Sequence, residues 1–213
     1  MASKAKRPGS VIVRGGRRSD ASTRAKRVAR AVPAATEWVY TLYRKPEGPF
    51  VHALNTEGFA LCLDLPAAAR SGPAAAGEWG LTLAPGDHML YAANPALGLV
   101  VEISASEAAG VRRTARIPRG AVGAAPRLAV SPDGATLYVP TGRGVAAVDT
   151  EWLELQRTLL RGHRVSAVVA SGRRLYAQDG AVLTLDAASG AVLARTPTSA
   201  PPAALAAVLP GSR

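Results

Sequence analysis

The sequence predicts an all-β chain, a β-propeller of about four four-stranded blades, preceded by a basic tail that we expect to be disordered. Three observations predict this fold. A strand–turn–strand signal recurs at intervals of 47 and 38 residues, apolar and polar residues alternate between the signals, and glycine and proline recur along the chain. Intervals of this length are typical of propeller blades and are too long for a simple hairpin repeat.

The clearest turn signal lies in residues 130–139, where a Pro-Asp-Gly turn separates two strands. Proline restricts the φ angle in such a turn, and glycine supplies the positive φ that closes it. Similar layouts recur in residues 83–91 and 169–176. In all three, the strand after the turn contains a Leu-Tyr pair, which we interpret as the second strand of a blade.

A third strand, a polar turn and a fourth strand follow each second strand. In the first fourth-strand segment, Phe59, Leu61 and Leu63 alternate with smaller or polar residues, as in a half-buried strand. Asp149 and Asp186 occupy equivalent turns, where a carboxylate can bond nearby backbone, so we interpret them as turn formers. The predicted third strands are residues 51–54, 99–103, 145–148 and 182–185, and the predicted fourth strands are residues 59–65, 111–117, 153–160 and 191–196.

The ends of the array leave two arrangements open. The first unit begins with a second-strand pattern at Trp38 and has no first strand of its own, whereas residues 203–209 resemble a first strand. Residues 203–209 would then complete the first blade and close a four-bladed ring. In the alternative, the chain is part of a larger propeller. The predicted units span about residues 38–65, 79–117, 126–160 and 165–196, with residues 66–77 as a flexible connector.

The run at residues 130–139, with Val148-Asp149-Thr150 behind it, resembles the YVTN family of β-propeller repeats. This family belongs to the group similar to the propeller subunit of quinoprotein amine dehydrogenases. The resemblance covers residues 38–213 as repeats and implies the fold, but it carries no catalytic residue over to this chain. Family members are usually seven-bladed and often extracytoplasmic, so four units without an export signal favour a partial version.

Most of the net charge of +11 lies in the N-terminal segment, since residues 1–37 hold 10 Lys/Arg and two acidic residues. We interpret residues 1–37 as a disordered tail. Two alternatives stay open: a short helix at residues 21–32 capped by Asp20, and contact of the tail with nucleic acid or an anionic membrane. Hydrophobic residues make up 48% and aromatic residues 5%, so the core must consist mainly of aliphatic side chains.

Targeting and cysteine content give the remaining general expectations. The chain has no apolar stretch long enough for a transmembrane helix and no signal-peptide pattern, so we expect a cytoplasmic protein. A truncated member of the resembled family would instead be extracytoplasmic. The single cysteine, Cys62, cannot form a disulfide within the chain and is expected to be a buried or half-buried, inert thiol.

The motifs that carry common enzyme chemistry are missing from the sequence. It contains no nucleotide-binding glycine motif and no nucleophile elbow, and the spacings of His52, His88 and His163 match no metal motif. We therefore expect no cofactor and no metal. One alternative remains, in which the central channel of a propeller gathers the three histidines from different blades.

The leading functional interpretation is a non-enzymatic scaffold that binds a protein or a small ligand on one propeller face. The loops after the second strands of different blades meet on one face, and their side chains define the partner. The alternatives are a propeller enzyme or enzyme subunit, dehydrogenase-like or lyase-like, and a fragment without independent activity. The candidate binding residues are Arg44, Lys45, Asn94, Arg143, Gln178 and Asp179.

Overall fold

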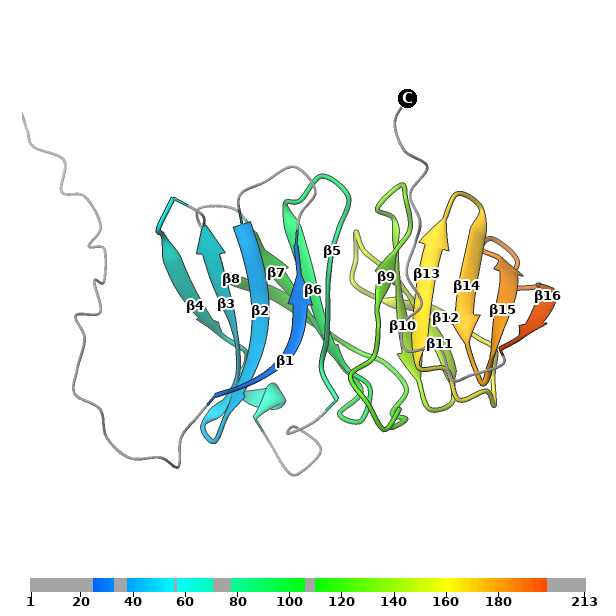
Figure 1. The fold of residues 1–213 in the computed structure, drawn as a ribbon, viewed down its shortest axis with the longest axis horizontal. Helices are drawn as coiled ribbons and strands as arrows, with labels where there is room; N and C mark the ends of the chain where they lie inside the picture. The colour runs from blue at the N-terminus through cyan, green and yellow to red at the C-terminus, as the bar shows by residue number, and fades with distance from the viewer. Residues whose placement is uncertain (1–24, 33–37, 56, 71–77, 106–109, 199–213) are drawn as a thin grey trace, which may run out of the picture.

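Four antiparallel sheets of four strands make up the structure, a computed structural model that describes residues 25–32, 38–55, 57–70, 78–105 and 110–198 (Figure 1). In each sheet the strands lie in chain order. The sheets are β1 (Lys26–Ala31), β2 (Trp38–Lys45), β3 (Gly48–Asn55) and β4 (Ala60–Asp64); β5 (Gly80–Leu83), β6 (Met89–Asn94), β7 (Leu99–Ser104) and β8 (Gly110–Arg116); β9 (Ala129–Val130), β10 (Thr136–Thr141), β11 (Gly144–Asp149) and β12 (Leu155–Leu159); and β13 (Ala167–Ser171), β14 (Arg174–Gln178), β15 (Ala181–Asp186) and β16 (Val192–Pro197).

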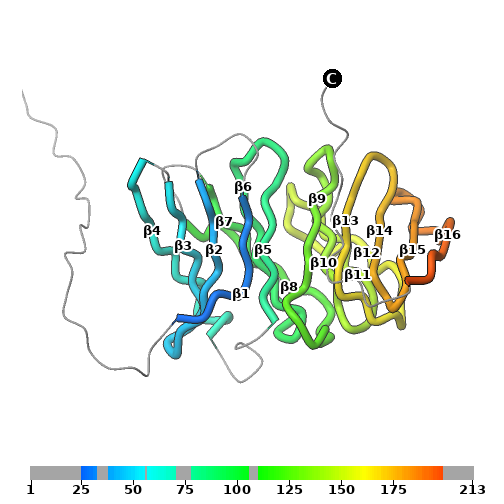
Figure 2. The backbone as a smooth tube through the Cα atoms, viewed as in Figure 1, coloured from blue at the N-terminus to red at the C-terminus, as the bar shows by residue number. Residues whose placement is uncertain are grey.

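The sheets stand side by side in the manner of propeller blades. Their first strands are neighbours: β1 contacts β5, β5 contacts β9, and β9 contacts β13. The third and fourth sheets are also joined by a short parallel bridge, in which the Val168 amide donates to the Arg127 carbonyl at 3.0 Å. Figures 1 and 2 show the sheets in chain order, with the first and fourth at opposite ends, so they form an arc. The predicted all-β propeller fold is confirmed.

The turn in residues 130–139 has the predicted geometry. Gly134 has a φ of 78°, and its amide donates to the Ser131 carbonyl at 2.8 Å. The Asp133 carboxylate accepts hydrogen bonds from the Ser131 hydroxyl and the Ala135 amide, and these bonds lower the pKa of Asp133 below its ordinary value. The carboxylate therefore stabilises the turn in its charged form.

Asp149 and Asp186 are turn formers, as predicted. Asp149 accepts a hydrogen bond from the Trp152 amide at 2.8 Å, and Asp186 accepts one from the Ser189 amide at the same distance. Both carboxylates thus satisfy amides that no strand partner reaches.

A repeated junction of side chains forms the core between neighbouring sheets. Leu137 of β10 and Val148 of β11 are paired in register, are fully buried, and pack with Tyr91 of the preceding sheet. One residue further along β10, Tyr138 points the other way and packs against the fourth sheet. We call these two sides of a sheet its leucine face and its tyrosine face.

The prediction that the first unit has no first strand of its own is wrong. Strand β1 pairs with β2, with Lys26 opposite Arg44 and Ala31 opposite Tyr40, and its Val28 packs against the core. Part of the expected disordered tail, and of the alternative helix at residues 21–32, is therefore a strand. Because β1 occupies the edge of β2, this edge is closed to the predicted closing segment, residues 203–209, which itself lies outside the described residues.

Two smaller expectations also change. Cys62 is exposed, contrary to the prediction, because β4 is the outermost strand of the first sheet. The predicted flexible connector at residues 66–77 begins with a short 3₁₀ helix, η1 (Ala67–Ala69), whose Ala69 is buried, while residues 71–77 lie outside the described residues. In the described part of the chain, none of the helical structure is long and apolar enough to cross a membrane.

Leu137→Ala is expected to lower the free energy of unfolding by about 2–5 kcal/mol, because it leaves a cavity between the second and third sheets. Leu155 lies in the same row of the third sheet and is 38% exposed. The control Leu155→Ala is therefore expected to cost less than about 1 kcal/mol. Urea denaturation followed by circular dichroism compares the two variants, and equal losses would contradict this burial pattern.

Candidate functional site

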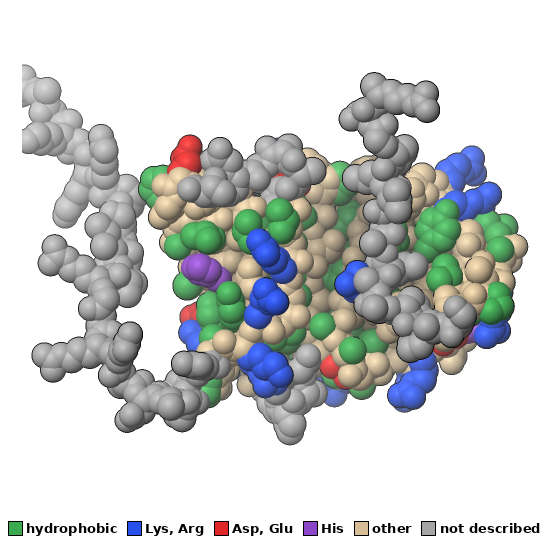
Figure 3. All heavy atoms as spheres, viewed as in Figure 1, with side chains coloured by type: hydrophobic (Ala, Val, Ile, Leu, Met, Phe, Trp, Pro, Cys, Tyr) green, Lys and Arg blue, Asp and Glu red, His purple; other side chains and the backbone are tan. Residues whose placement is uncertain are grey.

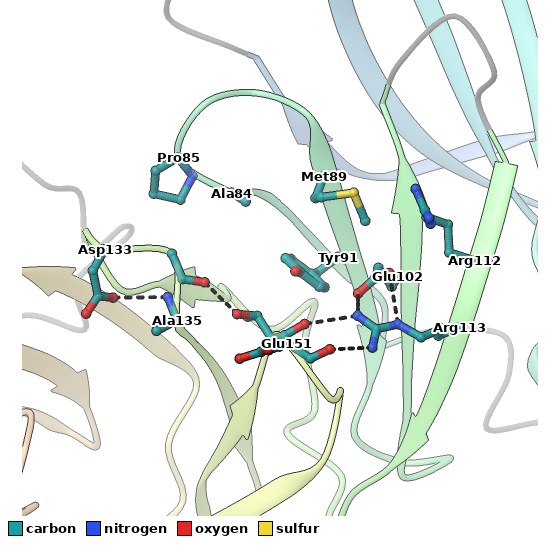
Figure 4. A pocket seen from close by; sticks show the side chains of 12 residues that line it. Ala84, Pro85, Met89, Tyr91, Glu102, Arg112, Arg113, Asp133, Ala135 and Glu151 are labelled. Atoms are coloured by element: carbon teal, nitrogen blue, oxygen red, sulfur yellow. Dashed lines mark hydrogen bonds and ion pairs between the residues drawn. The ribbon is translucent and has the colours of Figure 1, made fainter.

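Three surfaces of the described residues are candidates for a functional site. The first is a groove between the second and third sheets (Figure 4). The second is the loop edge, which we define as the edge that carries the turns between second and third strands and the connections between sheets, at the bottom of Figure 1. The third is the concave face formed by the first strands.

The groove between the second and third sheets has a volume of about 850 Å³. At its base, the Glu102 side chain is only 3% exposed and accepts two hydrogen bonds from Arg113, one of them 3.1 Å from Nε to Oε1. The same guanidinium crosses to the third sheet and donates to the carbonyl oxygens of Thr150 at 3.0 Å and Glu151 at 2.6 Å. Arg113 therefore bridges a buried carboxylate of one sheet and the backbone of the next (Figure 4).

Electrostatics in the groove follow from this bridge. The hydrogen bond to Glu102 raises the pKa of the Arg113 guanidinium above its usual range. Burial, followed by the nearby Glu102 carboxylate, raises the pKa of the Tyr91 hydroxyl. The site thus favours the charged form of the Arg113 guanidinium and the neutral form of the Tyr91 hydroxyl.

The bridge is one version of a contact that recurs at every junction. The Tyr40 hydroxyl of the first sheet donates to the Ala105 carbonyl of the second at 3.0 Å, and Arg157 of the third sheet donates to the Ala187 carbonyl of the fourth at 2.9 Å. Ala105, Thr150 and Ala187 all follow the third strand of their sheets by the same number of residues. The polar groups of the groove therefore have a structural role, because they join neighbouring sheets.

The structure places the six predicted binding residues along the loop edge but gives them different environments. Arg143 is exposed in the turn between β10 and β11, while Arg44 and Gln178 are half-buried at strand ends. Asn94 is fully buried, and its Oδ1 accepts the Leu97 amide at 3.0 Å, so it shapes its turn and offers no side chain to the surface.

The other two predicted residues have partners within the chain. The Nζ atom of Lys45 lies 3.3 Å from the Asp64 carboxylate and 4.9 Å from the centre of the Phe50 ring. The Asp179 carboxylate lies 2.6 Å from Nδ1 of His163, which comes from the connection between the third and fourth sheets. At the loop edge, a predicted turn is thus in direct contact with a connection between sheets.

Backbone hydrogen bonds join these turns and connections in a row. The Gly120 amide donates to the Pro95 carbonyl at 3.0 Å, Gly142 donates to Gly120 at 2.9 Å, and Gly162 donates to Arg143 at 3.2 Å. The approach at Gly142 requires glycine, because a Cβ there would lie 2.1 Å from the carbonyl oxygen of Ala121. The row brings together turns of the second and third sheets and the connections that follow these sheets.

Sequence analysis missed the arginines that this row carries. Arg119 and Arg161 directly precede Gly120 and Gly162, and Arg164 follows two residues later; all three are exposed. Together with Arg143 they form what we call the arginine edge. Among the described residues, none of these four arginines takes part in an ion pair.

Acidic groups near the arginine edge are already engaged. The Glu78 carboxylate accepts the amides of Val122 at 2.7 Å and Gly123 at 2.9 Å, and Asp179 contacts His163. Neither carboxylate forms an ion pair with the four arginines, which also outnumber them, so the arginine edge has an excess of positive charge.

The concave face carries a second basic surface that the sequence did not predict. A groove of about 830 Å³ lies between the first strands and is lined by Arg27 and Arg30 of β1 and by Arg127. Figure 3 shows Lys and Arg side chains gathered over β1. Arg27 and Arg30 were missed because the sequence predicts a disordered tail for residues 26–31, where the structure has β1.

The alternative of a histidine site in the channel is not supported. His52 lies within β3, His163 lies at the loop edge, and His88 lies in the turn between β5 and β6 at the opposite edge. In the described part of the chain, no three His, Cys, Asp or Glu residues are grouped so that they could hold a metal ion.

Comparison with known proteins identifies the fold. No family model matches the sequence, and no curated protein matches it. The structure is similar to hydrazine synthase from Kuenenia stuttgartiensis, with a TM-score of 0.63 and 17% identity over 80% of this chain and 48% of that chain. It is also similar to catalytically inactive virginiamycin B lyase from Staphylococcus aureus with quinupristin (TM-score 0.61, 14% identity, 83% and 57%) and to apo AztD from Citrobacter koseri (0.55, 15%, 83% and 47%).

These neighbours are β-propeller-like proteins, and at such identities the similarity shows the fold alone. The chain spans about half the length of the solved structures that it matches. The four sheets of this chain thus correspond to about half of each matched chain.

Arg113→Met is expected to lower the free energy of unfolding by about 3 kcal/mol, because it leaves the buried Glu102 carboxylate without its partner. The double variant with Glu102→Met removes that unpaired charge and is expected to regain most of the loss. Urea denaturation measures both. The exposed neighbour provides the control Arg112→Met, and a loss for Arg113→Met no larger than the control's would rule out the bridging role.

Proposed function

We propose that this chain is a propeller-type scaffold whose arginine edge binds an acidic segment of a partner protein. The observation that carries the proposal is the unneutralised charge of Arg119, Arg143, Arg161 and Arg164 on a single edge of the arc. A guanidinium presents a planar fork of donors that matches a carboxylate, so a group of arginines favours Asp and Glu side chains.

Rigidity of the backbone supports this proposal. The row of hydrogen bonds through Gly120 and Gly142 holds the arginine-bearing segments in place before any partner arrives. Less backbone entropy is then lost on binding than at a flexible loop. The long arginine side chains remain able to adapt to the spacing of carboxylates in the partner.

The groove between the second and third sheets also supports binding in preference to catalysis. Solved neighbours include enzymes, but a shared fold does not carry an activity with it. In this groove the carboxylates of Glu102 and Asp133 are engaged with Arg113 and with turn donors. Carboxylates held in this way stabilise the contact between sheets and the turn. We therefore propose the arginine edge, and not this groove, as the functional site.

We further assign the repeats to the YVTN type. The assignment is supported by the run at residues 130–139, where Gly134 closes the Pro-Asp-Gly turn with a φ of 78° and the following Leu-Tyr strand pairs with β9. In this assignment the matching residues are structural ones.

The proposal is tested with a fluorescein-labelled peptide of alternating Asp and Glu, titrated with the protein while anisotropy is recorded. The double variant Arg143→Glu/Arg161→Glu is expected to weaken binding by at least about tenfold at low salt, because it reverses two charges at the surface. Raising the ionic strength several-fold is expected to weaken wild-type binding as well, since exposed charges are screened.

Two comparisons make the result specific. Arg112→Glu/Arg195→Glu changes the net charge equally but alters exposed arginines on β8 and β16, so it is expected to keep most of the affinity. A DNA duplex of similar total charge serves as the second probe. Equal losses for both double variants, or binding of DNA without binding of the peptide, would refute an acidic-protein site at the arginine edge.

A further inference from the structure

The first sheet leaves its leucine face without the cover that the other sheets have. Ile103, Val148 and Leu185 occupy one register position of the third strand, each paired with the leucine of a Leu-Tyr strand, and all three are fully buried. In the first sheet this position is held by Leu54, paired with Val39, and Leu54 is 45% exposed.

Aromatic residues extend this uncovered face. Tyr43 stacks on Phe50 with ring centres 5.5 Å apart, and the rings of His52 and Tyr43 meet edge to face with centres 6.3 Å apart. All three are only partly buried. Figure 3 shows hydrophobic side chains beside a histidine over β2 and β3, facing the viewer. An apolar and aromatic surface of this kind is typical of an interface core.

The fourth sheet is uncovered on the opposite side, its tyrosine face. Tyr40, Tyr91 and Tyr138 are buried in the first three sheets, whereas the equivalent Tyr176 is partly exposed. Its register partner Thr184 is also partly exposed, although the equivalent residues of the first three sheets are buried. Those buried partners are Ala53, Glu102 and Ala147.

Each internal junction joins these same two kinds of face. The cluster between the second and third sheets combines Tyr91 with Leu137 and Val148, and the next cluster combines Tyr138 with Leu175 and Leu185. The arc therefore ends in the two halves of one junction, a leucine face at the first sheet and a tyrosine face at the fourth.

We propose that two copies of this chain associate head to tail, with the tyrosine face of the fourth sheet of each copy packed against the leucine face of the first sheet of the other. Two arcs of four sheets then close a ring of eight, within the usual range for propellers. The two new junctions are identical by twofold symmetry, and closure prevents further growth. The proposed acidic-partner site is not needed for this association.

The mass of the purified 213-residue chain in solution tests the proposal. Size-exclusion chromatography with light scattering, from about 1 to 100 µM, is expected to give twice the 21.9 kDa of one chain at the upper concentrations. A mass of one chain at all concentrations would overturn the proposal. A series of species growing with concentration would overturn it too, because a junction that does not close makes open filaments.

Leu54→Arg is expected to give the mass of a single chain, because it places a charge in both junctions, while circular dichroism stays that of a folded protein. Leu155→Arg makes the same substitution at a similarly exposed site on β12, outside the junction, and is expected to remain dimeric. If Leu54→Arg stays dimeric, or if both variants dissociate, the junction is not where we place it.

A mixing experiment distinguishes the head-to-tail arrangement from a symmetric contact between two first sheets. Tyr176→Glu on the fourth sheet is also expected to give single chains. Mixing Tyr176→Glu with Leu54→Arg restores one unmodified junction per pair, so some species of double mass are expected to return. No effect of Tyr176→Glu on the dimer, or no recovery on mixing, would contradict the arrangement.

Discussion

The packing of a leucine face on the tyrosine face of the preceding sheet is the contact on which the rest of the structure depends. One four-stranded sheet cannot bury both of its faces, so each sheet in the arc is stable only through its neighbours. Leu137 and Val148 on one side, and Tyr138 on the other, show how a single sheet takes part in two such junctions. Polar bridges, such as those of the Tyr40 hydroxyl and the paired Arg113, join the same neighbouring sheets.

Because the junctions supply the core, the residues at the two edges of the sheets are free to vary. At one edge the turns are held by their own carboxylates, as at Asp149 and Asp186. At the other, backbone bonds donated by Gly142 and Gly162 bring segments with four exposed arginines together. The same junction geometry also leaves an unpaired face at each end of the arc, which connects the proposed association with the fold itself.

The candidate site was less predictable than the fold. Turn positions were visible in the sequence, and Arg143 lies where they placed it. Asn94 looked equally polar but is buried, because its amide oxygen bonds the Leu97 amide within its own turn. Arg119 and Arg161 carried no distinguishing signal in the sequence, where an exposed arginine in a connection resembles any other. The bonds from Gly142 to Gly120 and from Gly162 to Arg143 bring their segments together.

By itself the sequence determined the strands, the tight turns and the repeat, because these depend on alternation and on local φ angles that Gly134 and its neighbours set directly. Only the tertiary structure decided the role of residues 26–31. A short segment with three basic residues carries little local strand signal, and it becomes a strand because the edge of β2 offers unpaired backbone groups. The exposure of Leu54 and Tyr176 was likewise decided by position in the arc, since their sequence contexts match those of buried equivalents.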